Sequence, residues 1–214
     1  MNSVRDRQGF REGVFLYIIF MAVNVIGSFG YRYTRGNALL TIFQSFGMLA
    51  IMLVVVLVMR RRGHPFFSIG HAGVALKKIW PVWVIALATA LVAANMQHTF
   101  GNHSFLWYAW LSLGVVLAPI TEEFVFRGAI QTSLNNTTLG STSIVGLRYG
   151  TLLSAIMFSC AHFTLLVNGV AMPRVLFEVF SALPLALAAG YIYQRTSNIW
   201  YGVFLHGLGN LGGA

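Results

Sequence analysis

The chain has 214 residues, of which 57% are hydrophobic and only 9% are charged. Soluble domains carry about 25% charged residues, so the 14 basic and 5 acidic side chains here cannot cover a water-exposed surface. The net charge of +9 comes from short basic clusters between apolar runs, not from a basic stripe with interleaved aromatic residues. The composition excludes a soluble enzyme, a disulfide scaffold and a disordered chain, and predicts an integral membrane protein that binds no nucleic acid.

A transmembrane helix needs about 20 mostly apolar residues. We expect spans, separated by polar or basic loops, at residues 13–31, 37–59, 79–96, 104–134, 149–167, 175–193 and 198–213. The fourth stretch is too long for one straight span, so it should be tilted, kinked at Pro119 or divided in two. Loops are expected at residues 60–78, 97–103 and 135–148. The sequence predicts an all-α, polytopic transmembrane helix bundle of about seven spans, forming a single membrane domain over residues 1–214.

The basic residues also indicate an orientation. With the N-terminus in the cytoplasm, ten Lys and Arg residues fall in inside segments and three fall in outside segments. Cytoplasmic segments of membrane proteins are enriched in these residues. We therefore expect a cytoplasmic N-terminus, an uncleaved first span and a location in the plasma membrane of a bacterium, with membrane lipid around the bundle.

Three charged residues interrupt the strongly apolar fourth stretch. Glu122 and Glu123 are adjacent, although the whole chain has only five acidic residues, and Arg127 follows. Glu123 and Arg127 are four residues apart, so on a helix they share a face and can pair. Glu122 is rotated by about 100° from its neighbour and points elsewhere. Because charges inside a membrane are costly, this group is a candidate functional site, with Glu122 the better candidate for a base.

Polar residues on two further spans complete the candidate site. His162 lies in the fifth span, and His206 lies in the last span with Asn210 one helical turn later. A lone histidine in a membrane is often only hydrogen-bonded across helices. Carboxylates, imidazoles and an amide from three spans could together activate water and stabilise an oxyanion. Cys160 lies about 200° around the helix from His162, which indicates a packing role and argues against a local thiol–base pair.

The motif spacing Glu-Glu-x-x-x-Arg, Phe-x-x-x-His and His-x-x-x-Asn resembles the CPBP intramembrane proteases. This family, also called Abi, contains CAAX proteases and bacteriocin-processing enzymes, and the present motifs are similar to those of its type II CAAX prenyl endopeptidases. Three motifs in order carry the resemblance over residues 105–214: Glu122, Glu123 and Arg127; Phe158 and His162; His206 and Asn210.

The resemblance implies catalytic roles for four residues: Glu122, His162, His206 and Asn210. The first glutamate and the first histidine would activate a water molecule, while the second histidine and the asparagine would stabilise the tetrahedral oxyanion. Three further residues would support the site by orienting it and compensating its charge: Glu123, Arg127 and Phe158.

Zinc is the competing mechanism. Two histidines and a carboxylate match the ligand set of some catalytic zinc sites, and the ligands would be Glu122, His162 and His206. The H-E-x-x-H helix of many metalloproteases is absent from the sequence. The resemblance favours a site without a cofactor, with zinc as the alternative.

The resemblance implies an endopeptidase that hydrolyses a peptide bond of a membrane-associated protein or peptide, whether or not the substrate is prenylated. The alternative is a protein without proteolytic activity on the same scaffold, acting in bacteriocin immunity or membrane interactions. A proton-coupled carrier would also use a Glu–Arg–His set, but it does not need the asparagine of the third motif.

Overall fold

The computed structural model describes residues 3–34, 38–61, 84 and 116–210. The long helices are α1 (Ser3–Thr34), α2 (Ala38–Arg61), α8 (Tyr149–Ala161), α9 (Met172–Thr196) and α10 (Ile199–Asn210). Shorter segments are α5 (Ala118–Glu123), the π-helix η2 (Phe124–Gln131), α6 (Thr132–Asn135), α7 (Thr138–Ser141) and the 3₁₀ helix η3 (His162–Leu166). Strands β1 (Ser143–Ile144) and β2 (Leu147–Arg148) form a small antiparallel hairpin. The predicted all-α class is confirmed for these residues.

The expected spans correspond to helices wherever the structure describes the chain. Helix α1 begins at Ser3 and is longer than the expected span at 13–31, because the basic N-terminal residues continue the same helix. Helix α2 covers the second span. The fifth span is α8 continued by η3, and the last two are α9 and α10. The expected third span at 79–96 and its neighbouring loops lie almost wholly outside the described residues.

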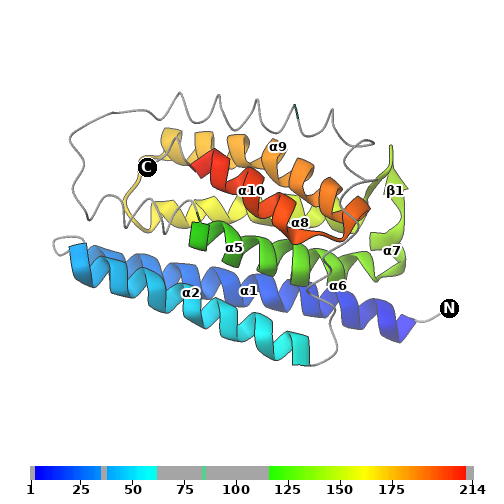
Figure 1. The fold of residues 1–214 in the computed structure, drawn as a ribbon, viewed down its shortest axis with the longest axis horizontal. Coiled ribbons are helices and arrows are strands. Elements are labelled where there is room, and N and C mark those ends of the chain that lie inside the picture. The colour runs from blue at the N-terminus through cyan, green and yellow to red at the C-terminus, as the bar shows by residue number, and fades with distance from the viewer. Residues whose placement is uncertain (1–2, 35–37, 62–83, 85–115, 211–214) are drawn as a thin grey trace.

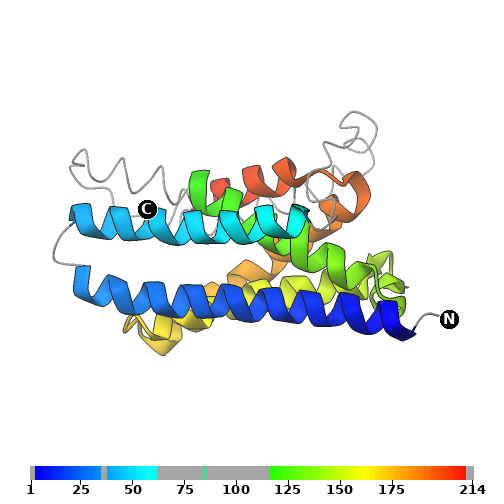
Figure 2. The same ribbon diagram turned by 90° about the horizontal axis from the view of Figure 1, so that it is seen from below.

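A central helix organises the bundle. Segments α5, η2 and α6 follow one another without a break, and together they contact α1, α2, α8, α9 and α10. Figure 1 shows this green helix between the α1–α2 pair and the α8–α10 group, and Figure 2 shows α1 and α2 running side by side. Pro119 occupies the first turn of α5, where a missing N–H is tolerated. All eight residues of η2 are buried, as expected of a helix packed on every side.

The expected polar loop at 135–148 contains more structure than the sequence pattern predicts. Thr137 caps α7, and its hydroxyl accepts a hydrogen bond from the Gly140 N–H at 2.9 Å. The hairpin turns at Val145 and Gly146, which both have positive φ, as a tight two-residue turn requires. The loop is therefore an ordered connection that brings α8 back against the central helix.

The distribution of polar and apolar residues is inverted relative to a soluble protein. Large apolar side chains on α1 and α9, including Phe15, Ile26 and Phe180, are more than half exposed. Three polar side chains of the central helix are buried instead: Glu123, Arg127 and Gln131. By length and composition, three described helical segments could cross a membrane: Asp6–Tyr33, Tyr149–Leu166 and Met172–Thr196. The pattern is that of a helix bundle whose polar groups face inward.

We expect Gly150→Ala to destabilise the bundle. A Cβ atom at this position would lie 2.7 Å from the Asn135 backbone nitrogen and 2.8 Å from the Leu134 carbonyl carbon, so α8 and α6 would have to separate. Overpacking of this kind costs about 1–3 kcal/mol. Thermal unfolding in detergent would measure the loss. Gly47→Ala is the matched control, because nothing lies within 4 Å of its Cβ position. Equal melting temperatures for both variants would contradict the predicted close contact.

Candidate active site

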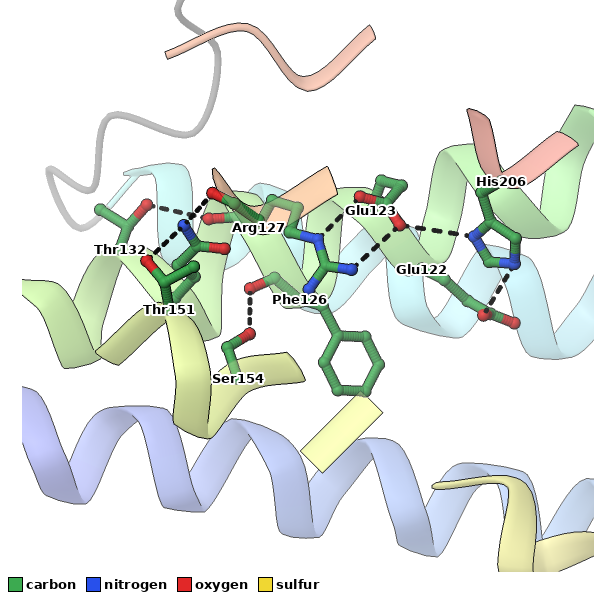
Figure 3. A network of polar contacts seen from close by, with 10 residues as sticks. Glu122, Glu123, Phe126, Arg127, Thr132, Thr151, Ser154 and His206 are labelled. Atoms are coloured by element: carbon green, nitrogen blue, oxygen red, sulfur yellow. Dashed lines mark hydrogen bonds and ion pairs between the residues drawn. The ribbon is translucent and has the colours of Figure 1, made fainter. Parts of the chain in front are cut away.

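A buried ion pair forms the centre of the site. The Arg127 Nε donates a hydrogen bond to Glu123 Oε2 at 2.9 Å, and Nη2 donates to Oε1 at 3.5 Å. Both side chains are 1% exposed, so the charges compensate each other without water. The predicted pairing of these two residues is confirmed. Figure 3 shows the pair lying along the central helix, with His206 approaching from α10.

Phe158 joins the ion pair to both histidines. The Arg127 guanidinium lies 5.3 Å from the centre of the Phe158 ring, a distance suited to a cation–π contact. The same ring makes edge-to-face contacts with His162 at 5.5 Å and with His206 at 5.2 Å between centroids. On its other side it packs edge-to-face on Phe126, with centroids 5.0 Å apart. The aromatic residue of the second motif thus fixes the relative positions of groups from three helices.

His206 lies between the two glutamates. Its Nδ1 is 3.4 Å from Glu123 Oε1, and its Nε2 is 3.7 Å from Glu122 Oε2. The side chain of Glu122 is 28% exposed, whereas that of Glu123 is 1% exposed. The adjacent carboxylates therefore occupy different environments, as their rotation on the helix predicts. Glu123 is enclosed by Arg127 and His206, and Glu122 is accessible.

Glu122 and His162 line the same cavity, which has a volume of about 160 Å³. The Nδ1 of His162 lies 3.3 Å from the Phe158 carbonyl oxygen and 3.2 Å from that of Ser159. Carbonyl oxygens only accept hydrogen bonds, so Nδ1 carries the proton in these contacts. In the neutral ring Nε2 then has the free lone pair and can accept a proton or a hydrogen bond.

Asn24 and Gly202 also shape the site, although neither belongs to the motifs. Asn24 of α1 lines the same cavity, and its amide donates a hydrogen bond to the Phe20 carbonyl oxygen at 2.9 Å. The sequence signal that could have identified Asn24 is its amide side chain within an otherwise apolar span. Gly202 lets α10 approach the ion pair, because a Cβ there would overlap Glu123 Oε2. The sequence offered no specific signal for Gly202, since the chain has 22 glycines.

Asn210 is the last residue of α10 and is partly buried, one turn beyond His206 on the same helix. The i, i+4 relation predicted for the third motif is therefore present. Arg174 and Glu178 form an ion pair at 2.8 Å near the start of α9, as side chains four residues apart on a helix can. Cys160 is a free, partly buried thiol.

A catalytic zinc ion needs about three protein ligands grouped around one point. Within the described residues, no three His, Cys, Asp or Glu side chains are grouped so that they could hold a metal ion. His206 directs one nitrogen at each glutamate, and Glu123 is engaged by Arg127. As arranged here, Glu122, His162 and His206 do not fit a zinc site.

The fold and the site define an integral membrane protein with carboxylate and imidazole groups around a small internal cavity. The sequence profile of the type II CAAX prenyl endopeptidase Rce1-like family matches residues 102–212, just over half of the 214 residues. The chain belongs to this family, and the resemblance seen in the three motifs is confirmed. Searches of curated proteins and of solved structures found no match.

We expect Arg127→Met to be strongly destabilising, because it leaves Glu123 buried without its compensating cation. Removing one partner of a buried pair costs about 3–5 kcal/mol. The double variant Glu123→Gln/Arg127→Met removes both charges and should recover most of the lost stability. Thermal unfolding in detergent would measure both. If the double variant were as unstable as Arg127→Met, the loss would come from packing and not from the unpaired carboxylate.

Proposed function

We propose that the protein is an intramembrane endopeptidase that hydrolyses a peptide bond of a membrane-associated protein or peptide. One observation carries the proposal: the partly exposed carboxylate of Glu122 and the imidazole of His162 line one small cavity. Membership of a family of prenyl endopeptidases supports a hydrolase. A cavity of about 160 Å³ suits a peptide group with a water molecule and is too small for a folded substrate.

In this proposal Glu122 accepts a proton from water, and His162 orients the water through its Nε2. The resulting hydroxide attacks the carbonyl carbon of the substrate, and negative charge develops on the carbonyl oxygen. His206 and Asn210 donate hydrogen bonds to that oxyanion. The C–N bond then breaks as the proton passes from Glu122 to the leaving nitrogen, which gives an amine and a carboxylic acid that retains the second proton of the water. Proton transfer and oxyanion stabilisation are each effective only when the groups are held in place beforehand.

The remaining motif residues have supporting roles in this mechanism. The contact of His206 Nδ1 with Glu123 at 3.4 Å orients the ring, so that Nε2 points toward Glu122, whose Oε2 lies 3.7 Å away. Arg127 keeps Glu123 charged and in place, and Phe158 packs against both histidines. These residues act through others and are positioning residues, not groups that contact the substrate.

The topology is part of the proposal. We propose about seven spans, a cytoplasmic N-terminus and a bacterial plasma membrane. Three described segments have the length and composition of spans, and the rest of the proposed count rests on the other apolar stretches of the sequence. The excess of basic residues in the inside segments supports the orientation.

Glu122→Gln tests the general base. The variant keeps the shape of the side chain but cannot accept the proton, so we expect turnover to fall about 10²–10⁴-fold. Release of peptide fragments by purified protein in detergent, from a library of membrane-protein segments, would measure the activity. Glu178→Gln is the matched control, because this glutamate pairs with Arg174 and does not line the cavity. Full activity of Glu122→Gln would falsify the proposed base, and inactivity of the unmodified protein on every segment would favour an immunity or interaction protein.

Removal of metal tests the zinc alternative. A zinc hydrolase needs its ion to polarise the substrate and to lower the pKa of bound water. We expect that dialysis against a strong chelator leaves turnover unchanged and that elemental analysis finds no stoichiometric zinc. Activity that disappears with the chelator and returns with added zinc would overturn the metal-free mechanism and make Glu122, His162 and His206 the candidate ligands.

A further inference from the structure

A second and larger hollow lies at the N-terminal end of α1, away from the proposed active site. It has a volume of about 730 Å³. One wall is the first turns of α1, and the other is the connection around α7. Its lining residues are Asp6, Arg7, Phe10, Arg11, Thr137, Thr138, Leu139 and Thr142. Figure 1 and Figure 2 both show the start of α1 and the α7 region at the same end of the bundle.

The polar side of this hollow is positively charged. Arg7 and Arg11 are one helical turn apart, so both guanidinium groups project from one face of α1. Within the described part of the chain, no acidic side chain forms an ion pair with either arginine. Asp6 contributes one negative charge, but its two oxygens accept hydrogen bonds from the Thr138 N–H at 2.8 Å and hydroxyl at 2.6 Å. Asp6 thus ties the two walls together, and the lining keeps one net positive charge.

The other side of the hollow is apolar and open to the surroundings. Phe10 is half exposed, and Leu139 is largely exposed. The hollow also lies where the membrane surface is expected, because the first candidate span begins at Asp6. At this end of the span, unpaired cations lie beside exposed apolar groups. The cations match the phosphate headgroup of a phospholipid, and the apolar groups match its acyl chains.

We propose that this hollow binds an anionic phospholipid. The phosphate lies between the Arg7 and Arg11 guanidinium groups, which can offer several N–H donors to its oxygens. The first part of an acyl chain lies against Phe10 and Leu139. The single phosphodiester charge of the lipid matches the single net positive charge of the lining. This site is independent of the proposed peptidase activity, since none of its residues lines the cavity of Glu122 and His162.

Native mass spectrometry of the full chain in detergent tests the site, with phosphatidylglycerol and phosphatidylcholine of identical acyl chains as probes. We expect retention of phosphatidylglycerol in preference to phosphatidylcholine. Each interfacial cation contributes roughly a fivefold change in affinity, so Arg7→Gln/Arg11→Gln should weaken phosphatidylglycerol binding about 30-fold. Arg7→Lys/Arg11→Lys keeps the charge and should retain most of the binding. Arg32→Gln is the matched control, because this exposed arginine lies at the opposite end of the same helix.

Three results would overturn the proposal. Equal retention of the two lipids would mean that the headgroup charge is not recognised. An equal loss in Arg32→Gln and in the double glutamine variant would mean that the protein attracts anionic lipid without a specific site. Displacement of the lipid by an equimolar soluble glycerol phosphate would mean that the arginines bind free phosphate and that the apolar wall contributes nothing. Melting temperatures of all variants would show that each one is folded.

Discussion

The buried pair of Glu123 and Arg127 is the interaction on which the rest of the structure depends. Taking a charged side chain out of water is costly unless the charge is paired, and two charged side chains lie buried here one helical turn apart. Their mutual hydrogen bond at 2.9 Å offsets this cost only if water cannot reach the two charges and separate them. The surrounding helices enclose the pair and keep water away, since both side chains are almost fully buried. The pair therefore constrains where its neighbours can pack more strongly than apolar contacts alone would.

The enclosure explains several features that would otherwise be unrelated. The π-helix η2 begins directly after Glu123 and contains Arg127 among its eight buried residues. Gly202 allows α10 to pack against the carboxylate, and Phe158 presents its ring to the guanidinium. Because α10 is this close, His206 reaches both glutamates. The buried pair of Glu123 and Arg127 therefore constrains the packing of the helices and also orients the His206 imidazole of the proposed active site. Segments of π-helix are frequent at functional sites, and η2 follows this pattern.

Local relations were predictable from the sequence, and distant ones were not. The pairing of Glu123 with Arg127, the different direction of Glu122 and the pairing of Arg174 with Glu178 all follow from the helical repeat. That His162 and His206 meet at one aromatic ring depends on the packing of α8 and α10 around the central helix. The sequence suggested that these polar groups act together, but not that both imidazoles contact the Phe158 ring. The polar run at 135–148 predicts a loop, but the cap at Thr137 and the turn at Val145 and Gly146 organise it. A valine at positive φ is unusual, so the residue types hide this turn.

The family profile matches residues 102–212, yet the cavity is not built from that segment alone. Phe20 and Asn24 of α1 line it beside Glu122 and His162, and α1 also packs against η2 and η3. An aqueous pocket inside a bundle needs a wall on each side, since an open side would expose the carboxylate to lipid. Helix α1 supplies one of these walls and places an amide in it. Helix α1 lies outside the three motifs, and it nevertheless contributes to the polarity and shape of the cavity that contains Glu122 and His162. A substitution at Phe20 or Asn24 would therefore alter the cavity without any change in Glu122 or His162.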